Sequence, residues 1–263
     1  MIPNLEIKAN NNINENENHY LNQPINNEEF YVNIPIKKHK STPGTDEITY
    51  HVIYHLPYTA RKILTKSFNE ILTTGKIPKE WKKFTIIPII KPNKLLGNAE
   101  NYRPIAITSC CRKIYEKIIT KRIIYCIERN SLWPKTQFGF RPGYGTYDNL
   151  TILTVDILNA FLDNDCIEAT FIDLHKAFDS VNIQILIHEL NKYNMNGHIL
   201  LSIKELITNR IITIKYKNQY TSSRITSQGI PQGTPLSPLL YIIYTKQSKK
   251  YPSMQECYNF QMI

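Results

Sequence analysis

The spacing of apolar residues along the chain predicts six helices. After Pro57, apolar side chains recur every three or four residues until Gly75 ends the pattern. The longest pattern begins at Ser109 and places isoleucines on one side of a helix and lysines and arginines on the other. Pro235 opens the last helix, since proline is tolerated in a first turn. The predicted helices cover residues 57–75, 109–127, 148–162, 183–193, 198–208 and 235–244.

Shorter stretches that are rich in β-branched residues predict strands. One covers residues 81–90 and ends at the polar segment 91–94. A second covers residues 167–174, where apolar and polar positions alternate. Residues 211–216 and 220–226 predict a hairpin. Helices and strands are mixed without a repeating strand–helix–strand unit, so the predicted fold class is α+β.

The first thirty residues differ in composition from the rest of the chain. Ten of them are asparagine, and five glutamates against one lysine give this segment a net charge of −4. The whole chain has a net charge of +10, so the remainder carries +14. A segment this polar has little to bury, and we expect residues 1–36 to be a disordered lead-in. The basic remainder suits a polyanion such as nucleic acid, or is simply a soluble basic surface.

The composition argues against several classes of protein. No apolar stretch approaches the roughly 20 residues of a membrane span, so we expect no membrane partner. The N-terminus has neither the basic nor the apolar region of a secretory signal. The five cysteines form no CxxC pair, which argues against a disulfide scaffold or a zinc site. We therefore expect an intracellular protein, in the cytoplasm or the nucleus, that is not secreted.

A carboxylate at the end of a predicted strand is the first candidate for chemistry. Asp173 stands near the end of the 167–174 stretch, and its carboxylate and the carbonyl oxygen of Leu174 could coordinate a divalent ion. Two such ions about 3.5–4 Å apart stabilise the attacking and leaving oxygens in phosphoryl transfer. An isolated aspartate at such a position is more simply interpreted as a helix cap. The surrounding sequence favours the metal ligand.

Residues 171–181, FIDLHKAFDSV, resemble motif A of reverse transcriptases. Other blocks in the same order resemble further motifs of non-LTR, LINE-type retrotransposon polymerases, near the jockey group. These blocks are KSTPGTD (40–46), KEWKK with IIPIIKP (79–92), NYRPI (101–105), QFGFR with GT (137–146) and GIPQGTPLSP (229–238, motif B). The resemblance implies the fingers and palm of a right-hand polymerase over residues 37–245, with an incomplete palm sheet and no thumb. Residues 246–263 remain as an aberrant tail.

The resemblance also implies roles for residues in and around motif A. Asp173 would be the first catalytic carboxylate and would bind Mg²⁺ together with the carbonyl of Leu174. Phe178 stands at the position of the steric gate, an aromatic ring that rejects a ribose 2′-hydroxyl; the alternative is a core aromatic. Asp179 would support the fold or the metal ligands. Arg141 would contact the template backbone or brace the fingers.

The incoming nucleotide is the implied ligand of a second group of residues. Lys91 or Lys94, together with Arg103, resemble the cations that hold the triphosphate. A planar guanidinium binds phosphate oxygens bidentately, which suits Arg103, whereas either lysine could be a solvated surface charge. Gln232 and Gly233 of motif B would lie against the nucleotide and the template base, where a glycine allows close approach of the backbone.

The resemblance fails after Pro238. Polymerases of this family complete the metal site with an aromatic-x-Asp-Asp hairpin, motif C, but no aspartate follows Asp179. The last eight residues, ECYNFQMI, have codons that can encode VLQFSDD, a motif C box, when they are read two bases later. We hypothesise that the reading frame slips near residues 245–250 and that the tail is a misreading of motif C. Codons incompatible with the shifted frame would refute this hypothesis.

The sequence therefore predicts the domain of an RNA-directed DNA polymerase. The parent would extend a DNA primer on an RNA template, using deoxynucleoside triphosphates and two Mg²⁺ ions. Without motif C, this chain alone is expected to be inactive, and its unpaired palm strand to cause poor solubility or partial unfolding. The alternative is a catalytically dead relic that only binds nucleic acid. An RNA-dependent RNA polymerase fits Phe178 less well, and a group II intron maturase fits the fingers blocks less well.

Overall fold

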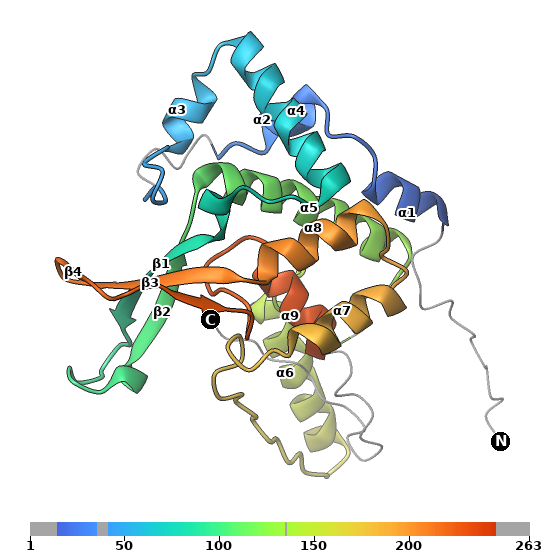
Figure 1. Ribbon diagram of the computed structural model, residues 1–263. Helices are drawn as coiled ribbons and strands as arrows, with labels where there is room; N and C mark the ends of the chain where they lie inside the picture. The colour runs from blue at the N-terminus through green and yellow to red at the C-terminus, as the bar shows by residue number, and fades with distance from the viewer. Residues whose placement is uncertain (1–14, 36–41, 135, 246–263) are drawn as a thin grey trace. The chain divides into compact units, whose positions relative to one another are not determined.

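The computed structural model describes residues 15–35, 42–134 and 136–245 (Figure 1). The chain divides into two units. The first contains the residues up to Leu132 together with Phe178–Tyr244, and the second contains Trp133–Ala177 and the residues from Thr245 onward. The described part is a mixture of helices and one small mixed sheet, which confirms the predicted α+β class.

The sheet belongs to the first unit and has the strand order β2-β1-β3-β4, with β5 paired to β3. β1 (Lys83–Ile90) pairs antiparallel with β2 (Tyr102–Ile107) and parallel with β3 (Arg210–Tyr216). The chain then turns back through β4 (Gln219–Tyr220) and β5 (Arg224–Thr226). The predicted hairpin is confirmed, and the predicted 81–90 strand begins two residues late because the 3₁₀ turn η1 (Lys79–Lys82) precedes it.

The helices of the first unit follow the sequence pattern closely. α4 (Tyr58–Thr74) ends at Gly75, whose φ of 69° is the left-handed conformation of a helix C-cap. α5 (Cys110–Arg129) begins after Ser109 and buries the isoleucines of the predicted stripe. The remaining elements are the short α3 (Tyr50–Tyr54) and η2 (Ala99–Asn101), and α7 (Ile183–Lys192), α8 (His198–Ile207) and α9 (Ser237–Thr245). The predicted helices at α7, α8 and α9 are confirmed, although α9 begins at Ser237, two residues after the predicted start at Pro235.

The core of the first unit is formed where α4, α5 and α8 meet. Phe68 of α4 contacts Trp81 and Tyr115 edge to face, with ring centroids 5.6 and 5.4 Å apart. The Tyr115 hydroxyl donates a hydrogen bond to the Ser202 hydroxyl at 2.9 Å, so its polar end is satisfied inside the core. Burial raises the pKa of Tyr115 well above its ordinary value.

Residues 15–35 of the expected disordered lead-in contain helices that pack on the core, whereas residues 1–14 and 36 of that prediction lie outside the described residues. Residues 15–35 contain α1 (Glu15–Leu21) and α2 (Asn27–Val32), and α5 contacts both helices. Their four large buried side chains are the reason, because these apolar residues dock on the core in spite of the asparagine-rich composition around them. They are Leu21, Ile25, Phe30 and Ile34.

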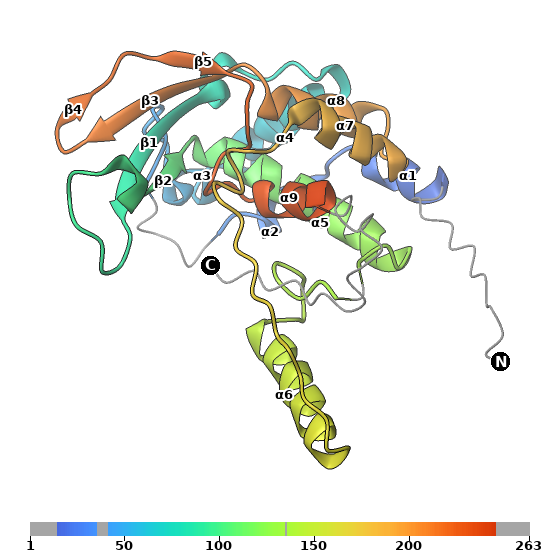
Figure 2. The ribbon, with the colours of Figure 1, turned by 90° about the horizontal axis from the view of Figure 1, so that it is seen from below.

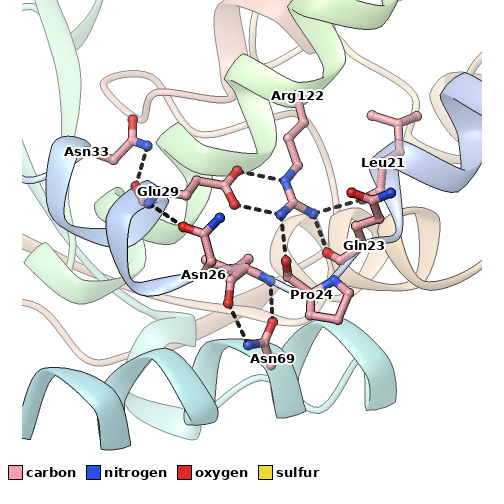
Figure 3. Close-up of polar contacts among 9 residues, drawn as sticks. Leu21, Gln23, Pro24, Asn26, Glu29, Asn33, Asn69 and Arg122 are labelled. Carbon is pink, nitrogen blue, oxygen red and sulfur yellow. Dashed lines mark hydrogen bonds and ion pairs between the residues drawn. The ribbon is translucent and has the colours of Figure 1, made fainter. Parts of the chain in front are cut away.

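One arginine of α5 fastens this segment (Figure 3). The guanidinium of Arg122 donates to both carboxylate oxygens of Glu29, at 2.8 and 2.7 Å, and to the carbonyl of Gln23 at 2.5 Å. The Asn69 side chain also bonds to the backbone N–H and C=O of Ile25 at 2.6 and 2.8 Å. Asn26 caps α2 by accepting from the backbone N–H of Glu29. Polar side chains whose abundance suggested disorder therefore cap a helix, as Asn26 does, or hold the segment to α5, as Glu29 does.

We expect Glu29→Gln to lower the free energy of unfolding by about 1.5–3 kcal/mol, because it replaces a charge-assisted bidentate pair at the buried Arg122. Glu28→Gln is the matched control, since Glu28 is exposed on the same turn and the substitution removes the same charge. Urea unfolding followed by circular dichroism measures both variants. Equal midpoints for the two would contradict the role of the clamp.

The second unit contains α6 (Thr146–Leu162), where a helix was predicted. The Asp148 carboxylate accepts from the backbone N–H of Gly145 at 2.6 Å and so caps its first turn. The predicted strand over residues 167–174 is wrong, since no helix or strand covers residues 163–174. A strand requires a neighbour for its N–H and C=O groups, and the described residues of this unit contain no other strand.

The helices formed by residues 15–35, 42–134 and 136–245 include none with both the length and the hydropathy of a membrane span.

Candidate nucleotide and template site

The motif B loop is bonded to the outer edge of β2. The backbone N–H of Ala106 donates to the carbonyl of Gln232 at 2.8 Å. Gly233 follows with a φ of +104°, and a Cβ there would lie 3.3 Å from the Ala106 carbonyl oxygen and 3.4 Å from Ile105 Cγ2. The chain at Gln232 and Gly233 is thus held tightly against a strand of the fingers sequence block.

The same loop is bonded to the C-terminal end of the motif A block, residues 178–181. The N–H of Gly229 donates to the Val181 carbonyl at 3.1 Å, and the N–H of Ile230 donates to the Phe178 carbonyl at 2.9 Å. Gly229 has a φ of +68°, and a Cβ there would lie 2.8 Å from backbone atoms of Asp179. Two segments far apart in the sequence are therefore locked together by their backbones.

Phe178 is half-buried at this junction. Its ring stacks on that of Tyr241, a buried residue of α9, with centroids 5.2 Å apart and an interplanar angle of 24°. Stacking on a buried ring fixes the orientation of Phe178 while part of its surface remains accessible. Both readings of this residue, a steric gate and a core aromatic, stay open as predictions.

The three fingers cations lie on and beside the β1–β2 hairpin. Lys91 braces the connecting loop, because its ammonium donates to the Glu100 carbonyl at 2.9 Å and its backbone N–H to the Asn101 carbonyl at 2.8 Å. Lys94 is exposed in the loop, and Arg103 is exposed on β2. Of the two lysines, Lys94 is therefore the better placed to meet a soluble ligand.

Arg103 lies close to the motif B loop along β2. It shares a face of the strand with Ile105, the residue whose side chain Gly233 approaches. Two residues of an extended strand span about 7 Å. The arrangement brings together an exposed guanidinium, an amide side chain and a tightly held glycine, which can bind a phosphate group, a base edge and a sugar or base face respectively.

Arg210 of β3 binds the start of the motif B loop. The sequence pattern did not identify it as a candidate residue. Its guanidinium is buried and donates to the carbonyls of Gln228 and Gly229 at 2.6 and 2.8 Å. The pKa of Arg210 is lowered to about 10, chiefly by burial and also by the nearby Arg112, while Asp179 opposes the shift. Asp179 thus faces a buried cation, as a supporting residue would, and its role stays a prediction. The only sequence signal was that Arg210 is in phase with Ile212 and Ile214.

Asp173, Leu174 and Arg141 belong to the second unit. Asp173 and Leu174 are exposed and lie outside helices and strands. The guanidinium of Arg141 lies over the ring of Tyr144, 4.2 Å from its centroid, and 5.7 Å from that of Trp133. These aromatic contacts are compatible with a brace, and the proposed template contact stays a prediction.

The described residues do not form a two-metal centre. No three or more histidine, cysteine, aspartate or glutamate side chains come together among them as metal ligands. One carboxylate and one carbonyl, from Asp173 and Leu174, are too few for a pair of Mg²⁺ ions that prefer six oxygens each. The hypothesised motif C lies in residues 246–263, outside the described residues.

Comparisons with known proteins agree with the resemblance in the sequence. The probable RNA-directed DNA polymerase from transposon BS of Drosophila melanogaster is 34% identical over 223 residues, which are 85% of this chain and 24% of that protein. The RNA-directed DNA polymerase from mobile element jockey of the same organism is 29% identical over 223 residues, with the same coverage of each chain. A type-1 R2 Pol polyprotein of Popillia japonica is 28% identical over 222 residues, 83% of this chain and 29% of that protein.

The chain thus spans about a quarter of the length of the curated relatives that it matches. The relationship to polymerases of jockey-like and other non-LTR transposons, predicted from the ordered motifs, is confirmed. The family described as reverse transcriptase (RNA-dependent DNA polymerase) matches residues 89–257, which is more than half of the chain. The chain therefore belongs to the reverse transcriptase family.

Proposed function

We propose that this chain is the fingers and palm portion of a non-LTR retrotransposon polymerase that extends a DNA 3′-hydroxyl by copying an RNA template. One observation supports this most strongly. The motif B loop is bonded on one side to β2, which carries Arg103, and on the other to Phe178 in the motif A block. Three blocks that the family resemblance assigns to one nucleotide site are thus neighbours in the fold.

Each group at this junction has a proposed task with the incoming deoxynucleoside triphosphate. The guanidinium of Arg103 binds phosphate oxygens in a bidentate manner, and Lys94 adds a second positive charge. Gln232 and Gly233 lie against the nucleotide and the template base. The ring of Phe178 excludes a ribose 2′-hydroxyl.

Metal chemistry is the part of the proposal that the described residues cannot supply. In the family, two Mg²⁺ ions would stabilise the attacking and leaving oxygens. Asp173 and the Leu174 carbonyl are the proposed ligands from this chain, and they do not suffice for two ions. We therefore propose that the chain as written binds nucleotide and nucleic acid but does not polymerise without motif C.

A primer-extension assay on an RNA template with Mg²⁺ tests the proposal. It compares the chain as written, a version with the shifted frame restored, and the restored version carrying Asp173→Ala. Only the restored version is expected to extend the primer. Asp163→Ala is the matched control, because Asp163 is another exposed aspartate of the same unit and its loss should leave extension unchanged.

Two outcomes would overturn parts of the proposal. Extension by the chain as written would show that catalysis does not need motif C. A restored version that fails to extend the primer, although it is folded, would overturn the assignment as a working polymerase and favour a relic that only binds nucleic acid.

An intracellular setting, in the cytoplasm or the nucleus, is part of the same proposal. The described cysteines are free thiols, of which Cys110, Cys111 and Cys126 are buried and Cys166 is exposed. Burial raises the pKa of Cys111 to about 12, so this thiol stays protonated and unreactive at neutral pH. Free thiols are typical of a reducing compartment.

A further inference from the structure

The two faces of the sheet in the first unit differ in how they are covered. Residues paired in register share a face. On one face, Phe84, Ala106 and Arg210 are buried, and the guanidinium of Arg112 lies 4.5 Å from the centroid of Phe84. We call the other one the open sheet face, since none of its side chains is buried. Its members are Lys83, Thr85, Ile87, Ile89, Arg103, Ile105, Ile107, Ile211, Thr213, Lys215, Tyr220 and Ile225.

The outer end of the open sheet face pairs a cation with an aromatic ring. Lys215 of β3 and Tyr220 of β4 are directly opposite in the ladder, and the Lys215 ammonium lies 5.3 Å from the centroid of the Tyr220 ring. Tyr220 is 60% exposed. Figures 1 and 2 both show the β3–β4 hairpin projecting away from the helices of its unit, so solvent reaches this pair.

The charged side chains of residues 210–226, which form β3, β4 and β5, are all positive. Residues 210–226 contain two arginines and two lysines, and no aspartate or glutamate occurs between Glu205 and Glu256. Lys217 adds a second cation–aromatic contact, 5.7 Å from the ring of Tyr216 on the opposite face. Exposed tyrosines beside lysines are what a single nucleic-acid strand requires, namely rings for its bases and cations for its phosphates. An acidic protein surface would use the cations but not the exposed rings.

The open sheet face is continuous with the proposed nucleotide site. Arg103 lies on it, and Gly233 approaches the side chain of Ile105 on it. Three strand spacings separate β2 from β4, which corresponds to about 14 Å across the sheet. A strand whose base is read beside Gly233 can therefore continue across the apolar isoleucines to Tyr220.

We propose that the open sheet face binds single-stranded RNA, with a base stacked on Tyr220 and a phosphate held by Lys215. The identification of this strand as the unpaired template rests on the proposed function. The binding itself requires no catalysis, and the two can be tested apart.

Fluorescence anisotropy with the full chain and a labelled, unstructured 12-nucleotide oligouridine measures the binding. We expect Tyr220→Ala to weaken binding about tenfold, because stacking on one aromatic side chain is lost, and Tyr220→Phe to bind like the unchanged chain. Lys215→Ala should lower the slope of log affinity against log salt concentration by about 0.7, as expected for one phosphate contact. Tyr58→Ala is the matched control, since Tyr58 is 63% exposed on α4 with Lys62 one turn away.

Three results would overturn the inference. The first is that Tyr220→Ala binds oligouridine as tightly as the unchanged chain, and the second is that Tyr58→Ala loses as much affinity for oligouridine as Tyr220→Ala. The third is that Tyr220→Ala loses as much affinity for a 12-base-pair RNA duplex as for oligouridine, which would indicate that the surface does not distinguish single strands. Failure of the proposed function looks different. In that case the frame-restored protein does not extend primers, yet the dependence of single-strand binding on Tyr220 persists.

Discussion

Replacement of Arg112 by methionine is expected to lower the free energy of unfolding by about 3–5 kcal/mol, because it leaves the Glu116 carboxylate buried without a cation. The side chains of Arg112 and Glu116 are 0% and 1% exposed, and they lie 2.7 Å apart on successive turns of α5. The same guanidinium donates to the carbonyls of Trp81 and Leu206 at 2.6 and 3.0 Å. One side chain therefore joins α5 to η1, the turn that precedes β1, and to the end of α8.

The double variant Arg112→Met/Glu116→Leu separates the loss of the ion pair from the burial of an unpaired charge. Apolar residues of similar volume often replace a buried pair at little cost, so we expect the double variant to recover most of the lost stability. Oε2 of Glu116 is buried without a hydrogen-bond partner in the described part of the chain, which adds to the cost of keeping the carboxylate. Urea unfolding at pH 7 measures all three proteins. A double variant no more stable than Arg112→Met would contradict this account.

The sequence pattern predicts an element well where burial follows one period. The isoleucines of α5 and the stop at Gly75 are local signals, and the structure agrees with both. The pattern did not reveal β2, because Pro104 interrupts it. A proline cannot donate to a ladder, but β2 is an edge strand and tolerates it.

Tertiary partners explain the other differences between sequence and structure. Alternation over residues 167–174 predicts a strand only if a second strand lies beside it, and the described residues of that unit provide none. The apolar periodicity also does not predict which arginines are buried, because the partners of a buried arginine come from elsewhere in the chain. Arg122, for example, binds Glu29 and three carbonyls of a distant segment.

In the candidate site, the sequence likewise indicates individual residues but not the contacts between distant segments. The motifs indicate Arg103, Gln232 and Gly233 from the sequence alone, because resemblance to a motif identifies individual residues. The resemblance could not show that the Ala106 N–H donates to Gln232, or that Arg210 donates to Gly229, because these pairs are 126 and 19 positions apart in the chain and meet only in the folded structure. Asp173 is named by the motif alone, and its neighbours in a working centre stay a prediction.

Gly229→Ala is expected to destabilise the first unit by about 2–4 kcal/mol and to loosen the motif B loop. Part of the cost is the positive φ of +68°, which an L side chain rarely adopts. The rest arises because the added Cβ would lie 2.8 Å from Asp179 Cα and its carbonyl oxygen, and 2.9 Å from the Phe178 carbonyl oxygen. Backbone atoms cannot swing away as a side chain can, so the hydrogen bond from Ile230 to Phe178 has to lengthen.

Gly97→Ala separates these two contributions. Gly97 lies in the β1–β2 loop of the same unit with a φ of +106°, and a Cβ there meets nothing within 4 Å. It should incur only the conformational cost of about 1 kcal/mol. Urea unfolding gives the stability difference, and hydrogen exchange at the Ala106 and Ile230 amides shows whether the loop has moved. If both variants unfold at the same urea concentration and both amides stay protected, the close approach at Gly229 does not hold motif B against motif A.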